Sequence, residues 1–229
     1  MNQALQVGLM VPNNNTTMEK ELLYWLPAGS GCVTQRIPRG KGLLDARTLP
    51  EYLNEALRLA PVFDQPQIDV VAYGCTAAGF ISGPAGDAAL QQNLAKITRK
   101  NVVTTAHSMV QALQEKGIKK IALVTPYLEG VNVQLKAFLA EGGVEVLSFN
   151  SFYAQNTDEL GMISSAQVAQ MARQTMREDC EALFIGCSQL PTCEILPDLE
   201  REWGRPVLSS IQVTAHFALQ AVQSAKGFV

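Results

Sequence analysis

Two cysteines in this sequence follow a glycine at the end of an apolar run. Cys75 ends the first run and Cys187 ends the second, 112 residues later, in the segments Asp69–Cys75 and Glu181–Cys187. A cysteine thiol can act as a soft nucleophile or carry a proton. Two thiols at equivalent positions therefore predict a site in which one thiol lies on each side of a flat substrate.

The other chemically active side chains have weaker contexts. Cys32 and Cys180 stand at the starts of apolar runs, and Cys193 has no counterpart in the other half, so we expect small buried hydrophobes at all three. His107 and His216 lie in helical patterns and are expected to be structural or at the surface. An odd number of cysteines, five, without an export signal predicts reduced thiols, and the absence of a C-x-x-C pair predicts no metal site.

The overall composition excludes several classes of partner. The chain has 229 residues, 47% hydrophobic and 17% charged, with a formal net charge of −3. No basic block points to nucleic acid or an anionic membrane, and no apolar run approaches the ~18 residues of a membrane span. The first residues carry no leader pattern, so we expect a cytoplasmic location.

The chain contains an internal repeat. Four landmarks occur in the same order and at similar offsets in both halves. Apolar strands resemble one another, so any single pair would also fit two unrelated βα stretches, but the shared order favours a genuine two-fold repeat. Besides the two Gly-Cys motifs, the pairs are Val7–Pro12 with Ile121–Pro126, Val33–Pro38 with Val144–Phe149, and Val102–Thr105 with Val207–Ser210.

Each half alternates short apolar runs with longer amphipathic stretches. This pattern predicts the α/β class, with two pseudo-symmetric lobes that each hold a four-stranded parallel sheet flanked by helices. The boundaries are about 1–115 and 116–229, with the site between the lobes. Thr16–Glu19 has the pattern of a capping box that opens a helix. The last helix, Val213–Gln223, is expected to pack back across the first lobe.

The Gly-Cys turns are expected to form a binding site because ligands of α/β sheets bind beyond the carboxyl ends of the strands. The residues that follow, Thr76 and Ala77 in the first turn and Ser188 in the second, can present free backbone N–H groups to a carboxylate. The glycine before each cysteine would let the backbone approach the ligand closely.

Two further strand ends offer hydrogen-bond donors. The first strand ends in Asn13–Asn15, whose amides are neutral donors that place no cation beside the thiols. The equivalent end in the second half carries Tyr127, whose hydroxyl could reach the substrate from the opposite side. Ordinary turn chemistry is the alternative explanation for both.

At these residues the chain resembles a known family. Pro12–Glu19 is similar to the P-x-x-N-T-T-M-E opening of maleate cis-trans isomerases, a branch of the aspartate/glutamate racemase superfamily beside the arylmalonate decarboxylases. The resemblance covers essentially the whole chain, including both Gly-Cys turns and the Thr-Pro-Tyr segment that ends at Tyr127. The opening motif is fairly specific, whereas the Gly-Cys turns are shared across the superfamily.

The resemblance implies a role for each matching residue. Cys75 would be the nucleophile and Cys187 the acid or base of the second lobe. Asn15 would hold a substrate carboxylate, Tyr127 would bind the substrate, and Asn156 is a weaker match to a second carboxylate-binding asparagine. The family requires neither a metal nor an organic cofactor.

The leading hypothesis is a maleate cis-trans isomerase that acts on maleate or a close cis-butenedioate. The resemblance implies that arylmalonate decarboxylases keep only the second cysteine, so Cys75 counts against that activity. Amino-acid racemases of the superfamily usually read Cys-Asn-Thr where this chain reads Cys75-Thr76-Ala77, and neither strand-end motif holds an acidic side chain for an ammonium group.

Three alternatives stay open. They are an Asp/Glu- or hydantoin-type racemase using both cysteines, an arylmalonate decarboxylase-like enzyme, and a non-catalytic carboxylate-binding protein. Two equivalent thiols argue against the last, because binding alone does not need them. The expected partner is a small dicarboxylate, and a homodimer or higher homo-oligomer is compatible with the sequence.

Overall fold

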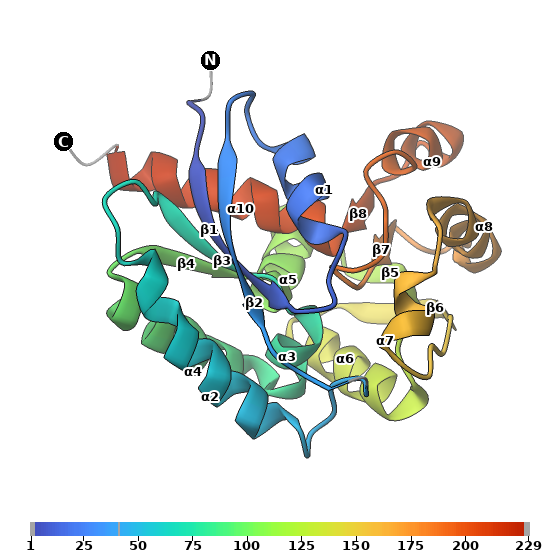
Figure 1. Ribbon diagram of the computed structural model, residues 1–229. Helices are drawn as coiled ribbons and strands as arrows, with labels where there is room; N and C mark the ends of the chain where they lie inside the picture. Colours follow the sequence, from blue (N-terminus) through green and yellow to red (C-terminus); the bar gives the residue numbers. More distant parts are fainter. Residues whose placement is uncertain (1–2, 41, 227–229) are drawn as a thin grey trace.

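The computed structural model describes residues 3–40 and 42–226, and these form two parallel β-sheets with helices on both faces (Figure 1). Residues 1, 2, 41 and 227–229 lie outside this description. They include the first residues of the first expected lobe and the last residues of the second. Each sheet has four strands, as the sequence predicts.

The first sheet has the strand order β2-β1-β3-β4, with the helices of the first half around it. Helices α2 and α4 cover one face, while α1 and the C-terminal helix α10 cover the other (Figure 1). The elements are β1 Gln6–Pro12, α1 Met18–Trp25, β2 Gly31–Ile37, α2 Leu49–Leu59, the 3₁₀ helix η1 Ala60–Phe63, β3 Val70–Tyr73, α3 Thr76–Ile81, α4 Gly83–Thr98, β4 Asn101–Thr104 and α5 Thr105–Glu115.

The second sheet repeats the first with the order β6-β5-β7-β8. Backbone bonds repeat as well: the N–H of Gly74 donates to the carbonyl of Met10 (2.7 Å), and the N–H of Gly186 donates to that of Val124 (2.8 Å). The elements are β5 Lys120–Thr125, α6 Glu129–Glu141, β6 Glu145–Ser151, α7 Thr157–Gly161, α8 Ser165–Thr175, β7 Ala182–Ile185, α9 Leu196–Trp203, β8 Val207–Ser209 and α10 Ser210–Lys226.

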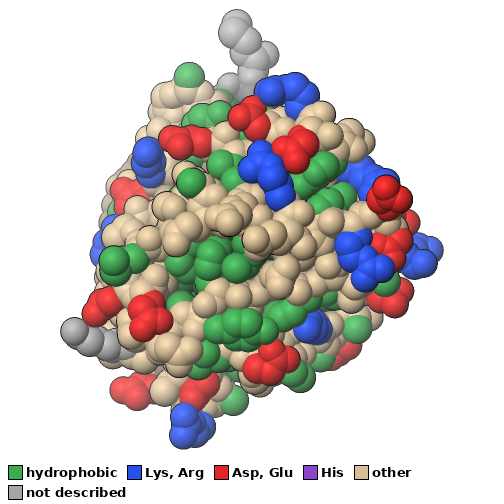
Figure 2. Space-filling model, turned by 90° about the vertical axis from the view of Figure 1, so that its right-hand side faces the viewer, with side chains coloured by type: hydrophobic (Ala, Val, Ile, Leu, Met, Phe, Trp, Pro, Cys, Tyr) green, Lys and Arg blue, Asp and Glu red, His purple; other side chains and the backbone are tan. Residues whose placement is uncertain are grey.

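The burial of each sheet between helices explains why the strands appear in the sequence as apolar runs. The inner strands β3 and β7 are buried along their whole length because helices cover both faces, whereas the edge strands β2 and β6 are mostly half-buried. Figure 2 looks onto the second lobe and shows charged side chains of both signs mixed with apolar and uncharged surface.

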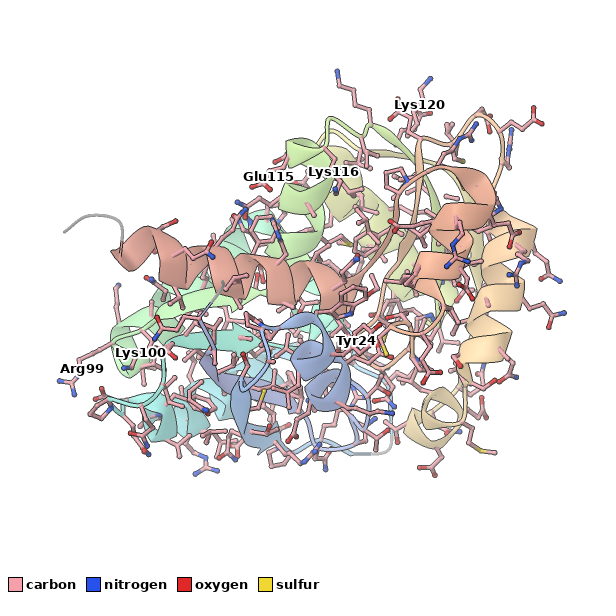
Figure 3. All side chains as sticks on the ribbon, turned by 90° about the horizontal axis from the view of Figure 1, so that it is seen from above. Tyr24, Arg99, Lys100, Glu115, Lys116 and Lys120 are labelled. Carbon is pink, nitrogen blue, oxygen red and sulfur yellow. The ribbon has the colours of Figure 1, made fainter. Side chains whose placement is uncertain are left out.

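Helix α10 crosses from the second half of the chain to the first lobe, as the sequence predicts. It packs against α1, α5 and β4, and it begins three residues earlier than expected, at Ser210. Seen from above, α10 runs beside α1, on which Tyr24 is exposed, and past the end of α5 at Glu115 and Lys116 (Figure 3). The first lobe is therefore completed by a segment of the second half.

The start of α1 differs from the predicted capping box. The side chain of Thr17, the residue before the helix, makes no capping hydrogen bond. Instead, Asn15 Oδ1 accepts the N–H groups of Thr17 (3.1 Å) and Met18 (2.9 Å). The asparagine takes this role because its short side chain can reach backbone N–H groups two and three residues ahead.

The glycine before Cys75 is required by packing. A Cβ atom on Gly74 would lie 2.4 Å from Met18 Sδ, 2.9 Å from Val11 Cγ1 and 3.0 Å from the Met10 carbonyl oxygen. A Cβ atom on Gly186 would meet nothing closer than 3.5 Å. Gly74 thus has a steric reason of its own, and the expectation that both glycines allow close approach to a ligand stays a prediction.

These contacts make the two glycines a matched pair for a stability test. We expect Gly74→Ala to lower the free energy of unfolding by about 1–3 kcal/mol, the usual cost of forcing an extra carbon into a packed core. Gly186→Ala should change it by much less, because its Cβ makes only ordinary contacts. Urea unfolding followed by circular dichroism measures both; equal losses would contradict this explanation.

Candidate active site

A pocket of about 260 Å³ lies between the two lobes, where the carboxyl ends of strands from both sheets meet. Parallel sheets bring these strand ends to one edge, so the loops that follow them line one space. The lining residues come from six segments at these strand ends, which include the first turns of α3 and α6 and part of α7: Pro12, Asn14 and Asn15; Arg39, Leu43, Leu44, Asp45 and Arg47; Cys75, Thr76 and Ala77; Tyr127, Leu128 and Val131; Gln155 and Leu160; and Cys187, Ser188 and Gln189.

Cys75 is the residue before helix α3, with its thiol in the pocket. It is 4% exposed, and its backbone is extended (φ −112°, ψ 92°) before the helix begins at Thr76. Burial raises the pKa of the Cys75 thiol, while the Arg39 cation and the backbone N–H groups of Ala77 and Ala78 lower it. The helix start thus stabilises the thiolate relative to an equally buried thiol elsewhere.

Cys187 lies at the equivalent strand end, but a turn rather than a helix follows it. It is 6% exposed, and the Gln189 N–H donates to its Sγ at 3.4 Å. Burial raises the pKa of the Cys187 thiol, and the Gln189 N–H and the Tyr127 hydroxyl lower it. Both thiols of the pair therefore face one pocket, and in both burial opposes the charged form.

Arg39 places a cation in this pocket, in addition to the neutral asparagine donors that the sequence suggested. It follows β2 and is half-buried in the pocket wall, and its Nε donates to Asn14 Oδ1 at 2.9 Å. Its two terminal nitrogens make no hydrogen bond or ion pair with the described residues. Its charge lowers the pKa of both Cys75 and Cys187. Arg39 can thus favour a thiolate and receive a substrate carboxylate.

The pocket also holds one carboxylate, which the strand-end motifs did not suggest. Asp45 Oδ2 pairs with the Arg47 Nη2 at 2.8 Å, and Oδ1 accepts the N–H groups of Arg47 and Thr48 (both 3.0 Å). The hydrogen bond from the Arg47 side chain, with those from the backbone, lowers the pKa of Asp45 to about 2. Because these groups occupy both oxygens, Asp45 is poorly placed to pair with a substrate ammonium.

The structure brings most of the predicted site residues together. Seven of them, Asn15, Cys75, Thr76, Ala77, Tyr127, Cys187 and Ser188, line the pocket. Thr76 is 1% exposed, and its buried Oγ1 has no hydrogen-bond partner within the described chain. A buried, unpaired hydroxyl beside Cys75 is available to donate to a ligand oxygen.

Asn15 and Ser188 already hold the two lobes together. Asn15 Nδ2 donates to the Ser188 carbonyl (3.1 Å) and to Ser188 Oγ (3.3 Å), and Ser188 Oγ donates to the Gly74 carbonyl (2.7 Å). The Asn15 side chain therefore joins α1 to the second cysteine turn. Its role in holding a substrate carboxylate stays a prediction.

Asn156 does not join the other predicted residues. It is the residue before α7, where its Oδ1 accepts the N–H groups of Asp158 (3.0 Å) and Glu159 (2.9 Å), and its Nδ2 donates to Glu159 Oε1. The neighbouring Gln155 lines the pocket in its place. In this structure Asn156 is a helix cap outside the pocket lining, and its role as a carboxylate-binding residue stays a prediction.

The remaining cysteines and both histidines lie outside the pocket lining. Burial, followed by the Glu19 charge, raises the pKa of Cys32 to about 12. Burial together with the Glu21 carboxylate raises that of Cys193 to about 11. His107 and His216 are exposed on α5 and α10. These placements leave Cys75 and Cys187 as the thiols of the pocket.

The described residues form neither a metal-binding cluster nor a membrane-spanning helix. In 3–40 and 42–226, no three His, Cys, Asp or Glu side chains gather closely enough to hold a metal ion. The helices in these ranges are each too short or too polar to cross a membrane.

Comparison with known proteins places this geometry in a family. The model of the arylmalonate decarboxylase family matches residues 35–226. The chain belongs to the arylmalonate decarboxylase family. This assignment, together with the relatives described next, confirms the predicted branch of the superfamily.

Relatives in this family group include maleate isomerases. The chain is 27% identical to a maleate isomerase of Nocardia farcinica, covering 95% of this chain and 90% of the relative. It is 24% identical to a maleate isomerase of Geobacillus stearothermophilus, covering 97% and 93%. The expectation of an enzyme similar to the maleate isomerases is confirmed.

A solved structure shows the same fold. It is a cysteine-to-serine variant of the Nocardia farcinica maleate cis-trans isomerase with a covalently bound succinylcysteine intermediate. The TM-score is 0.86 at 23% identity, and the match covers 96% of this chain and 94% of the other. The predicted two-lobed fold is thereby confirmed.

Sequence reasoning missed several pocket residues of this family member. Arg39 and Gln155 follow the edge strands β2 and β6, whereas the Gly-Cys turns, Asn15 and Tyr127 follow inner strands. Their signal was positional: in a parallel sheet every strand end reaches the ligand edge, including those of edge strands. The residues that follow each predicted strand, edge strands included, contain Arg39 and Gln155.

Proposed function

We propose that this protein is a cis-trans isomerase that converts maleate, or a close cis-butenedioate, to its trans isomer with Cys75 as the nucleophile. The observation that carries this proposal is the meeting of two cysteines from equivalent strand ends in one pocket with a cation, Arg39. Relatives named maleate isomerase that align with nearly the whole chain support it.

The chemistry follows from the two thiols. The Cys75 thiolate adds to one alkene carbon, so that a C–S bond forms and the π electrons move into the adjacent carboxylate as an enediolate. The former double bond is now single and rotates. Collapse of the enediolate then re-forms the double bond in the trans geometry and expels the Cys75 thiolate. Protons and electrons balance over this cycle without a redox partner.

The surrounding groups suit the charge that develops in this cycle. The Arg39 guanidinium and the unpaired Thr76 hydroxyl are donors for an oxygen that becomes more negative in the intermediate. The Cys187 thiol, bonded by the Gln189 N–H, can protonate the second carbon transiently or shield the intermediate from water. Both functions use Cys187 from the side opposite Cys75.

Arylmalonate decarboxylation is the second candidate, favoured by the family model. Aliphatic side chains in the pocket lining also suit a substrate with an apolar group; they are Leu43, Leu44, Leu128, Val131 and Leu160. A thiol in the Cys75 position is not needed for that reaction. After loss of carbon dioxide, one acid suffices to protonate one face of the resulting enediolate. Racemisation is less well supported, since Asp45 is occupied by Arg47.

The proposal predicts that the purified protein converts maleate to fumarate without added metal or nucleotide. Proton NMR follows the reaction, and a thiol-alkylating reagent should stop it. Deuterium on the vinylic carbons of the product, in deuterated water, would show that Cys187 protonates the intermediate. Untouched maleate together with carbon dioxide release from aryl malonates, or α-hydrogen exchange on aspartate or glutamate, would overturn the proposal.

A further inference from the structure

Helix α1 carries a carboxylate in an unusual place. Glu21 is 3% exposed and lies on the same helix face as Met18 and Leu22, which belong to the core. It forms no ion pair with the residues described in the structure. A buried carboxylate without a cation is costly unless hydrogen bonds replace its water, so such a group usually has a specific role.

Glu21 directs both of its oxygens to one residue of the other lobe. The N–H of Thr192 donates to Glu21 Oε1 at 2.7 Å, and Thr192 Oγ1 donates to Oε2 at 2.8 Å. Thr192 is 1% exposed and lies five residues after Cys187. Charged acceptors form stronger hydrogen bonds than neutral ones, and two hydrogen bonds to one carboxylate also fix the orientation of Thr192 relative to Glu21.

The rest of the second cysteine turn is joined to the first lobe by neutral groups. The Thr16 N–H donates to Gln189 Oε1 and Gln189 Nε2 donates to Thr16 Oγ1, both at 3.0 Å. Ser188 is joined to Asn15 and Gly74 as described above. Among these first-lobe residues that contact the turn, Glu21 is the charged one. It binds Thr192, the contact residue farthest in sequence from Cys187.

The same carboxylate lies beside a third thiol. Cys193 directly follows Thr192, is 6% exposed, and has a pKa raised to about 11 by burial and by Glu21. A negative charge at this position keeps a thiol close to the active site in its unreactive, protonated form. Loss of that charge should therefore be detectable at Cys193 independently of any turnover.

We propose that Glu21 is a positioning residue, whose two hydrogen bonds to Thr192 hold the turn that carries Cys187 against the first lobe. Cys187 must face a substrate bound at Cys75, and these thiols belong to different lobes. A contact across the lobes therefore sets their mutual placement. This inference rests on the proposed function only for its kinetic consequence, since the placement of the turn is independent of the substrate.

The test compares Glu21→Gln with Glu19→Gln, two charge-neutralising changes on one helix. Glu19 is half-buried, pairs with Arg36 at 3.5 Å and makes no contact that joins the lobes. Glutamine at position 21 keeps one acceptor but places an NH₂ group against a Thr192 donor. We expect kcat with maleate to fall by about 10- to 100-fold while KM changes little, because the loss is one of alignment. The control should retain normal kcat.

Alkylation by iodoacetamide, read residue by residue by peptide mass spectrometry, supplies a readout that needs no activity. In Glu21→Gln, Cys187 should be labelled several-fold faster than in Glu19→Gln because its turn is loosened, and Cys193 should react at lower pH. Equal labelling of Cys187 in the two variants would overturn the inference, even if kcat falls. If the unmodified protein leaves maleate unchanged, the proposed function fails while this comparison still decides the role of Glu21.

A second pair of variants covers the case in which Glu21→Gln does not fold. Thr192→Val removes the hydroxyl bond to Glu21, together with the hydroxyl contact to Ser209 in the same lobe, and keeps the N–H bond, whereas Thr192→Ser keeps all three. We expect faster Cys187 labelling in the valine variant and rescue to the original rate in the serine variant. Equal labelling in both would again overturn the inference.

Discussion

Replacing Cys75 with serine should lower kcat on maleate by about 10³-fold or more while the protein stays folded. A serine hydroxyl is almost never ionised near neutral pH and is a much poorer nucleophile toward an alkene carbon than a thiolate. The side chain is nearly isosteric, so the 4% exposed site should tolerate it. Turnover by NMR and thermal unfolding by circular dichroism measure the two effects separately.

Cys187→Ser should have a different signature from Cys75→Ser. Its kcat should also fall by orders of magnitude, but Cys75 remains free to add to maleate. Once water supplies the proton to the second carbon, no Cys187 thiolate is present to remove it again, so a protein–substrate adduct should accumulate. Intact-protein mass spectrometry would then show a mass increase equal to that of maleic acid, located on the Cys75 peptide. The succinylcysteine in a cysteine-to-serine variant of the Nocardia farcinica relative is a precedent for such an adduct.

Cys193→Ser is the matched control for both cysteine variants. Cys193 is as buried as Cys187, at 6% exposure each, but does not line the pocket. Its replacement should affect stability more than kcat. A well-folded Cys193→Ser protein with a loss of turnover as large as that of Cys187→Ser would show that the second thiol has been assigned to the wrong residue.

Arg39→Gln should lower kcat/KM by about 10²-fold near neutral pH and shift the pH dependence of the rate. Burial already raises the pKa of Cys75, so activity should rise with pH as the thiolate forms. The Arg39 cation lowers that pKa, and its removal must raise it further. The rising limb of kcat/KM against pH should therefore move to higher pH.

Arg47→Gln provides the comparison for Arg39→Gln. Arg47 also lines the pocket, but its side chain is 91% exposed and pairs with Asp45. Its removal should change the pH profile little, since a solvated and already paired charge acts weakly at a distance. Identical shifts in the two variants would indicate a general effect of net charge and would contradict a specific role for Arg39.

The parts of the fold that the sequence predicts well are those controlled by burial and repetition. Cys75 and Cys187 could be paired because each follows a fully buried inner strand, and such strands are recognisable as apolar runs bounded by glycine. The shared strand order of the two sheets follows from the same repeat. The crossing of α10 could be anticipated because its apolar face needs a partner.

The parts that could not be predicted lie in irregular loops. Gln155, not Asn156, lines the pocket, and the preceding loop contains Tyr153 in a left-handed conformation (φ 50°), which breaks the alternation that a strand would continue. Sequence periodicity cannot specify which residue points inward after such a break. Arg39 escaped notice for a related reason, because the segment from Pro38 to Thr48 has neither helical nor strand periodicity.

The crossing of α10 also has a consequence for how the protein is made. The strands of the first sheet are synthesised before residue 105, yet part of one face of that sheet is covered by residues 210–226. Domains of most chains fold in the order in which they leave the ribosome. Here the lobe that is translated first is completed last, and until then its apolar face is a natural target for chaperones.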